Sequence, residues 1–185
     1  MSEEKIESIQ EYMMLREEII HLDSIINNTI GFFYAFMSAY LVVILESTEN
    51  KLFYLNLSYL IVWATYAIVL SKMQGLCKIG AYLKVYHEGK GKIFNWETRN
   101  LQFEKKNRSL IFRLIISGNF PFVFMSTVIA LISVYLTISE YADVKYFFVT
   151  LILYSLTLCL IIFNRNIRTK DYICDWDEVK SFDEM

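Results

Sequence analysis

Few residues in this chain have the type and spacing that catalysis or metal binding requires. Neither His21 nor His87 has a second histidine four residues away or a matched nucleophile. The three cysteines, Cys77, Cys159 and Cys174, form no Cys-x-x-Cys pair, and we interpret them as reduced thiols. The sequence also has no phosphate-binding glycine loop, dinucleotide fingerprint or serine nucleophile elbow. We therefore expect a protein that is not an enzyme and that carries no cofactor and no metal ion.

A row of small and polar residues recurs from Asn119 to Glu140, along the segment 114–139 and the residue after it, at alternating spacings of four and three. These spacings place the row on one face of a helix, opposite large apolar residues such as Phe124 and Leu131. Because small and polar residues mediate helix association in lipid, the row indicates either packing within one bundle or the lining of a pore between subunits. Pro121 lies inside the same segment and predicts a kink near Ser117. The residues of this row, here called the polar stripe, are Asn119, Val123, Ser126, Ala130, Ser133, Thr137 and Glu140.

Basic residues are concentrated in the central segment 71–113. Two interpretations of them remain open: a topology signal in contact with anionic lipid, or a site for a phosphate-bearing ligand such as a nucleotide or oligonucleotide. Phe94, Trp96 and Phe103 lie nearby and could stack on bases. The candidate contacts are Lys84, Lys92, Arg99, Lys105, Lys106 and Arg108.

The composition identifies the elements that must position these residues. Hydrophobic residues make up 55% of the 185 residues, against about 45–50% in soluble domains. Four runs without a charged residue or histidine are long enough to cross a hydrocarbon core of about 30 Å. This pattern excludes a soluble globular enzyme and a disordered protein, and it argues against a proton-coupled transporter, which needs an ionisable group in its spans. The four runs are 29–45, 52–70, 114–139 and 146–164.

The distribution of Lys and Arg predicts the orientation of these spans. The leader 1–28, the central segment 71–113 and the tail 165–185 contain sixteen of these residues. The two short turns between spans contain one each, Lys51 and Lys145. Since positive charge is retained on the cytoplasmic side, we expect both termini and the central segment to be cytoplasmic. The predicted fold is an all-α membrane protein with four transmembrane helices arranged as two hairpins, and with helical leader and central segments.

The leader carries an apolar seam at spacings of three and four. We expect a helix that runs into the first span, with the second span continuing as a helix to about His87. The seam permits two alternatives: packing against the protein's own cytoplasmic segment, or association between copies in a homo-oligomer, of which a tetramer is one form. The leader has a net charge of −5 and segment 71–113 has one of +7, so the two attract each other. The seam consists of Tyr12, Leu15, Ile19, Leu22 and Ile26.

The arrangement resembles the small four-span membrane proteins of bacterial antiphage defence systems. The matching features are the acidic leader helix with Tyr12-Met-Met-Leu-Arg-Glu-Glu-Ile, the first hairpin, and Ala81-Tyr-Leu-Lys-Val-Tyr-His-Glu followed by Trp96-Glu97. Members of this class include the membrane effector of Hailong, an oligomeric channel gated by a nucleic-acid signal. Another is the membrane subunit of Kiwa, a sensor bound to a cytosolic DNA-binding protein. The resemblance implies a multi-pass protein of the bacterial inner membrane, and it assigns no site residue.

Two hypotheses of function follow from the resemblance and the residues. The first is an oligomeric membrane effector of abortive infection that forms or gates an ion pathway on a cytosolic signal, which a nucleotide or oligonucleotide could provide. The second is a non-conducting scaffold or infection sensor that recruits a cytosolic partner, either a signal-producing enzyme or a DNA-binding protein. The polar stripe supports the first hypothesis, and the charged leader and central segment support the second.

Overall fold

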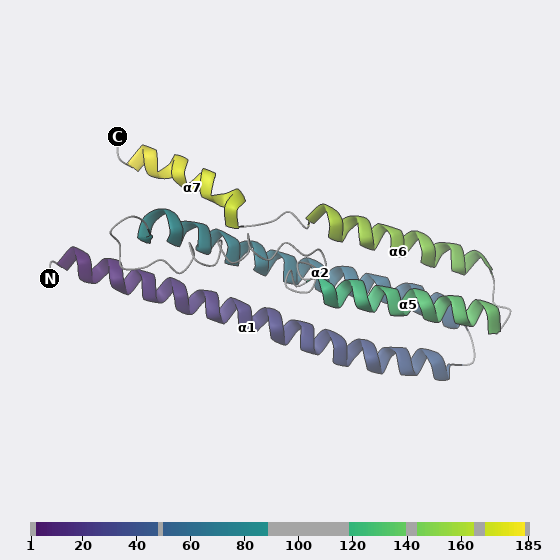
Figure 1. Ribbon diagram of the computed structural model, residues 1–185. Helices are drawn as coiled ribbons and strands as arrows, with labels where there is room; N and C mark the ends of the chain where they lie inside the picture. Colours follow the sequence, from purple (N-terminus) through teal and green to yellow (C-terminus); the bar gives the residue numbers. More distant parts are fainter. Residues whose placement is uncertain (1–2, 48–49, 89–118, 140–143, 165–168, 184–185) are drawn as a thin grey trace. The chain divides into compact units, whose positions relative to one another are not determined.

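The chain is all-helical in the residues that the structure, a computed structural model, describes: 3–47, 50–88, 119–139, 144–164 and 169–183. No strand occurs in these ranges, which confirms the predicted all-α class (Figure 1). The elements are α1 (Glu3–Glu46), α2 (Lys51–Tyr82), the π-helix η1 (Leu83–His87), α5 (Phe120–Ser139), α6 (Val144–Asn164) and α7 (Thr169–Asp183).

Four of these helices are long and apolar enough to cross a membrane: α1, the helix formed by α2 with η1, α5 and α6. They contain the four predicted spans, although the described part of the third begins only at Asn119. At 1.5 Å per residue, the 44 residues of α1 extend about 66 Å, roughly twice a hydrocarbon core. The leader and the first span are therefore one continuous helix, as the apolar periodicity predicts.

The chain divides into two compact units, and α1 and α2 contribute residues to both. Unit 1 comprises 1–27, 70–113 and 167–185, and unit 2 comprises 28–69 and 114–166.

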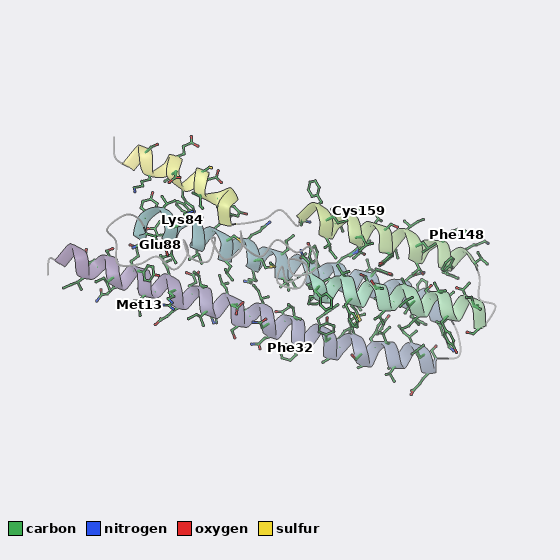
Figure 2. All side chains as sticks on the ribbon, viewed as in Figure 1. Met13, Phe32, Lys84, Glu88, Phe148 and Cys159 are labelled. Carbon is green, nitrogen blue, oxygen red and sulfur yellow. The ribbon has the colours of Figure 1, made fainter. Side chains whose placement is uncertain are left out.

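The core of unit 2 forms where α1, α2 and α5 bring large side chains together. The ring of Phe122 is completely buried and lies 5.2 Å from the ring of Phe33 and 5.2 Å from that of Tyr66, measured between centroids. The outward faces of these helices are apolar as well: Phe32 is 77% exposed and Phe163 is 85% exposed. Figure 2 shows Phe32 and Phe148 projecting away from their helices. Apolar residues on both faces are expected of helices that contact lipid outside and protein inside.

The core of unit 1 joins the leader part of α1 to the end of α2 and to η1. Tyr12, Ile19 and Leu83 form its buried cluster. Leu22 of α1 faces Gly75 of α2, where a Cβ atom would make an ordinary van der Waals contact with Cδ1 of Leu22 at 3.8 Å. The partly buried residues packed against the cluster are Leu15, Leu76 and Ile79.

Two helix starts follow from local sequence chemistry. Asn50 has a positive φ of 54°, a conformation that asparagine tolerates better than most residues, and its carbonyl accepts the amide of Phe53 at 2.9 Å. Pro121 lies in the first turn of α5, where a missing amide removes no helical hydrogen bond. The predicted kink involves Ser117, which lies outside the described residues, so it stays a prediction.

Candidate functional site

The polar stripe of α5 faces the interior of unit 2. Ser126 and Ser133 have no exposed surface, and Asn119 is 6% exposed. Val123, Ala130 and Thr137 are partly buried, and Glu140 lies outside the described residues. The opposite face is exposed, with Leu131 at 64% and Tyr135 at 67%. Of the two alternatives for the stripe, burial within a single chain favours packing.

A buried hydrogen-bond network connects α2, α5 and α6 around Thr150. The Thr150 hydroxyl donates to Oδ1 of Asn56 at 2.7 Å and lies 3.0 Å from the hydroxyl of Ser133. Nδ2 of Asn56 donates to the carbonyl of Tyr146 at 3.2 Å. Because these groups are buried among apolar side chains, leaving one without a partner would destabilise the bundle. The network therefore fixes how the three helices are rotated against one another.

Two more polar contacts hold α2 against its neighbours. The Tyr59 hydroxyl donates to the carbonyl of Ser126 at 3.2 Å, and Nε1 of Trp63 donates to the Thr157 hydroxyl at 2.8 Å. The Ser126 hydroxyl is used within α5, where it donates to the carbonyl of Phe122 at 2.7 Å. Each of these polar groups inside unit 2 is thus satisfied by the chain itself.

An apolar groove of about 350 Å³ opens between α2 and α6. Its walls are mostly hydrophobic, and the side chain of its one amide, Asn56, is engaged in the network around Thr150. Such a groove can take an acyl chain or another apolar ligand. Its lining residues are Phe53, Asn56, Leu57, Tyr59, Leu60, Tyr146, Val149 and Leu153.

The apolar seam of the leader is packed inside unit 1. Tyr12, Ile19 and Ile26 are 2%, 7% and 7% exposed, and Leu15 and Leu22 are partly buried. Tyr12 and Ile19 pack with Leu83, so this pair contacts the protein's own central segment. This is the first of the two alternatives that the seam permits.

His87 forms a polar cluster with α1 that sequence reasoning missed. Its Nδ1 lies 3.4 Å from the Ser8 hydroxyl, and its Nε2 lies 3.3 Å from Oε2 of Glu11. The Tyr82 hydroxyl donates to the other Glu11 oxygen at 2.7 Å. The rings of Tyr12 and Tyr82 are each 5.9 Å from the imidazole. No local sequence signal links positions 79 residues apart, which is why the cluster could not be found from spacing.

Serine, histidine and glutamate are the residue types of a hydrolytic triad, but the local geometry favours a structural role. Ser8 lies inside α1, where neighbouring backbone amides donate to helix carbonyls and cannot act as oxyanion donors. The cluster therefore cross-links α1 to η1 and fixes which face of the leader is buried.

Helix α7 lies against η1 (Figure 1). The Trp176 ring meets the Tyr82 ring edge-on at 5.1 Å, and the rings of Tyr82 and Tyr86 stack at 4.6 Å. Nζ of Lys180 lies 5.9 Å from the Tyr86 ring centroid and donates to the carbonyl of Val85 at 3.4 Å. Trp176 and Lys180 thus both connect α7 to the end of α2 and to η1.

Most of the candidate anion-binding residues fall outside the described residues. Lys84 is half-buried in η1 and is labelled in Figure 2. Lys92, Arg99, Lys105, Lys106 and Arg108 all lie in the part of the chain that is not described, so the ligand site stays a prediction. Among the described residues, no group of three His, Cys, Asp or Glu side chains could hold a metal ion.

Comparison of the chain with protein-family models, with curated proteins and with solved structures finds no match.

Proposed function

We propose that this chain is a membrane-anchored scaffold or sensor that holds a soluble partner protein on unit 1. In this proposal the four spans form two hairpins in a bacterial inner membrane, and both termini and unit 1 are cytoplasmic, in line with the distribution of basic residues. The setting in antiphage defence rests on the resemblance described above.

The observation that carries the proposal is that polar side chains in unit 2 form hydrogen bonds within the chain. Ser126 and Ser133, the stripe residues best suited to line a pore, are fully buried and hydrogen-bonded within one chain. Internal hydrogen bonds of these two serines favour an anchor over a conduit, although the buried hydroxyl of Tyr66 in the same unit has no partner among the described residues. Unit 1, in contrast, presents charged and apolar side chains on its surface, including Met14, which is 70% exposed, and Ile20, which is 62% exposed.

Affinity capture of the full-length protein from membranes tests the proposal. The tagged chain is expressed together with the soluble proteins encoded beside its gene, extracted in mild detergent, and its partners are quantified by mass spectrometry. We expect one soluble neighbour at a fixed ratio and no membrane depolarisation on overexpression. Recovery of a partner-free oligomer that depolarises the membrane would refute the scaffold and favour the second candidate.

A second candidate is an oligomeric effector that conducts ions between subunits, in which case α1 rather than α5 would line the path. Gly31, Ala35 and Ala39 recur every four residues on the exposed surface of α1, and a Cβ atom at Gly31 would meet nothing within 4 Å. Small residues at this spacing let transmembrane helices approach closely. Ser38, on the same exposed surface, would then face the path.

Recordings in planar bilayers test this candidate. In a background without native cysteines, we expect Ser38→Cys channels to lose current when a charged thiol reagent is added. Phe36→Cys is the matched control, because Phe36 is 55% exposed and lies about 160° around the axis of α1 from Ser38. Purified oligomers that never conduct, with or without nucleotides, would refute the candidate.

A further inference from the structure

We infer that the exposed face of the leader is a docking site for a basic amphipathic helix of the soluble partner. The inference rests on the proposed function, because it requires this surface to be cytoplasmic.

The rotation of the leader about its own axis is fixed by contacts on one side. Tyr12 and Ile19 are buried against Leu83, and the side chains of Ser8 and Glu11 contact His87. Helical geometry of about 100° per residue then places the opposite face of residues 6–27 outward. Figure 2 shows the Met13 side chain on the edge of α1 remote from α2.

This outward face carries a row of large apolar side chains at seven-residue intervals. Ile6, Met13 and Ile20 are 40%, 49% and 62% exposed, and Met14 beside them is 70% exposed. Large apolar residues recurring on a solvated helix surface indicate an interaction site. The interval of seven is the repeat with which one helix packs along another, so the geometry fits a helical partner. We call Ile6, Met13 and Ile20 the docking row.

The charges around the docking row select the chemistry of the partner. Residues 6–27 contain five acidic side chains against a single arginine, Arg16. Glu7 and Glu17 are exposed on one side of the row. A second copy would bring the same carboxylates together, and an anionic lipid surface would be repelled as well. A helix with apolar residues at the same interval and with Lys or Arg at its flanks matches both the apolar docking row and the acidic residues around it.

A defined peptide tests this inference on the full-length protein in nanodiscs of zwitterionic lipid. The probe is a fluorescent basic amphipathic helix with leucine every third and fourth position and lysine elsewhere. The comparison peptides are a scrambled version of equal charge and an acidic version with the same leucines, and empty nanodiscs serve as the blank. Binding is measured by fluorescence anisotropy at low and at high salt.

We expect the basic amphipathic peptide to bind at least about tenfold more tightly than either comparison peptide, with an affinity that falls as salt rises. The double variant Met13→Gln/Ile20→Gln should weaken that binding by about tenfold, because the contacts of two anchor side chains are lost. Val179→Gln, at an exposed apolar residue of α7 in the same unit, should leave it unchanged. Both variants alter exposed side chains, and circular dichroism checks that they retain the parent's helix content and melting temperature.

Four results would overturn the inference. The scrambled peptide could bind as tightly as the amphipathic one, or the double variant could bind like the parent. Mass photometry could instead show that the double variant dissociates an oligomer, which would make the row a contact between copies. If the double variant still captures the soluble neighbour, the scaffold stands and the docking row is wrong. If the peptide binds as expected but no neighbour is captured, the row stands and the proposed function fails.

Discussion

Replacing Ser126 by leucine separates packing from pore lining in unit 2. Ser126 has no exposed surface, its carbonyl accepts the Tyr59 hydroxyl, and its own hydroxyl is bonded to the carbonyl of Phe122. Leucine adds two heavy atoms at a position already enclosed by protein. Overfilling a packed interior typically costs about 1–3 kcal/mol, so the free energy of unfolding should fall by that amount.

Two matched variants show whether volume is the cause. Ser126→Ala removes only a hydrogen bond to the residue's own helix, so we expect it to change stability by less than about 1 kcal/mol. Ser139→Leu introduces the same side chain at an exposed position of the same helix, where the added atoms meet no packed neighbour. It should therefore behave like the parent. Stability is followed by circular dichroism during titration of the detergent-solubilised protein with sodium dodecyl sulfate.

The result that would refute this reasoning is a Ser126→Leu protein as stable as the parent. Such a protein would show that the added side chain enters open space. If it also assembled normally but lost a current carried by the parent, the serine would face a water-filled path that an apolar side chain closes by dewetting. Both the packing interpretation and the scaffold proposal would then be wrong.

Four further perturbations test other parts of the structure. Leu83→Ala should destabilise unit 1 by about 2–5 kcal/mol, because the side chain is 1% exposed in its core, and amide hydrogen exchange of the leader measures this loss. Trp176→Ala should release α7 and make the tail more sensitive to limited proteolysis, since the contact of its ring with that of Tyr82 is lost. Thr150→Val should lower the free energy of unfolding by about 1–2 kcal/mol in the dodecyl sulfate titration, because Oδ1 of Asn56 loses the hydrogen bond that the Thr150 hydroxyl donates. A cysteine at Thr48 should react with an impermeant thiol reagent added to intact cells and one at Lys92 should not, and the reverse labelling would overturn the predicted orientation.

The sequence permitted the prediction of the helical class and of the spans, because both depend on local properties. Uncharged runs of seventeen to twenty-six residues have few structures available in lipid, where the backbone must satisfy its own hydrogen bonds. The alternation of three and four along Tyr12, Leu15 and Ile19 likewise defined one helix face. The lack of charge in the spans, the apolar seam and the polar stripe were all visible before any contact was known.

What only the tertiary structure decided is which side chains each pattern meets within one chain. The stripe is compatible with a bundle or a pore, since small polar residues serve both, and the packing of the helices buries Ser126 and Ser133 within one chain. The seam is compatible with a contact between copies as well, and the placement of Leu83 gives Tyr12 and Ile19 a partner within unit 1. The cluster of Ser8, Glu11 and His87 had no signal at all. Local periodicity fixes which residues share a face, but contacts between residues 79 positions apart depend on how whole helices pack.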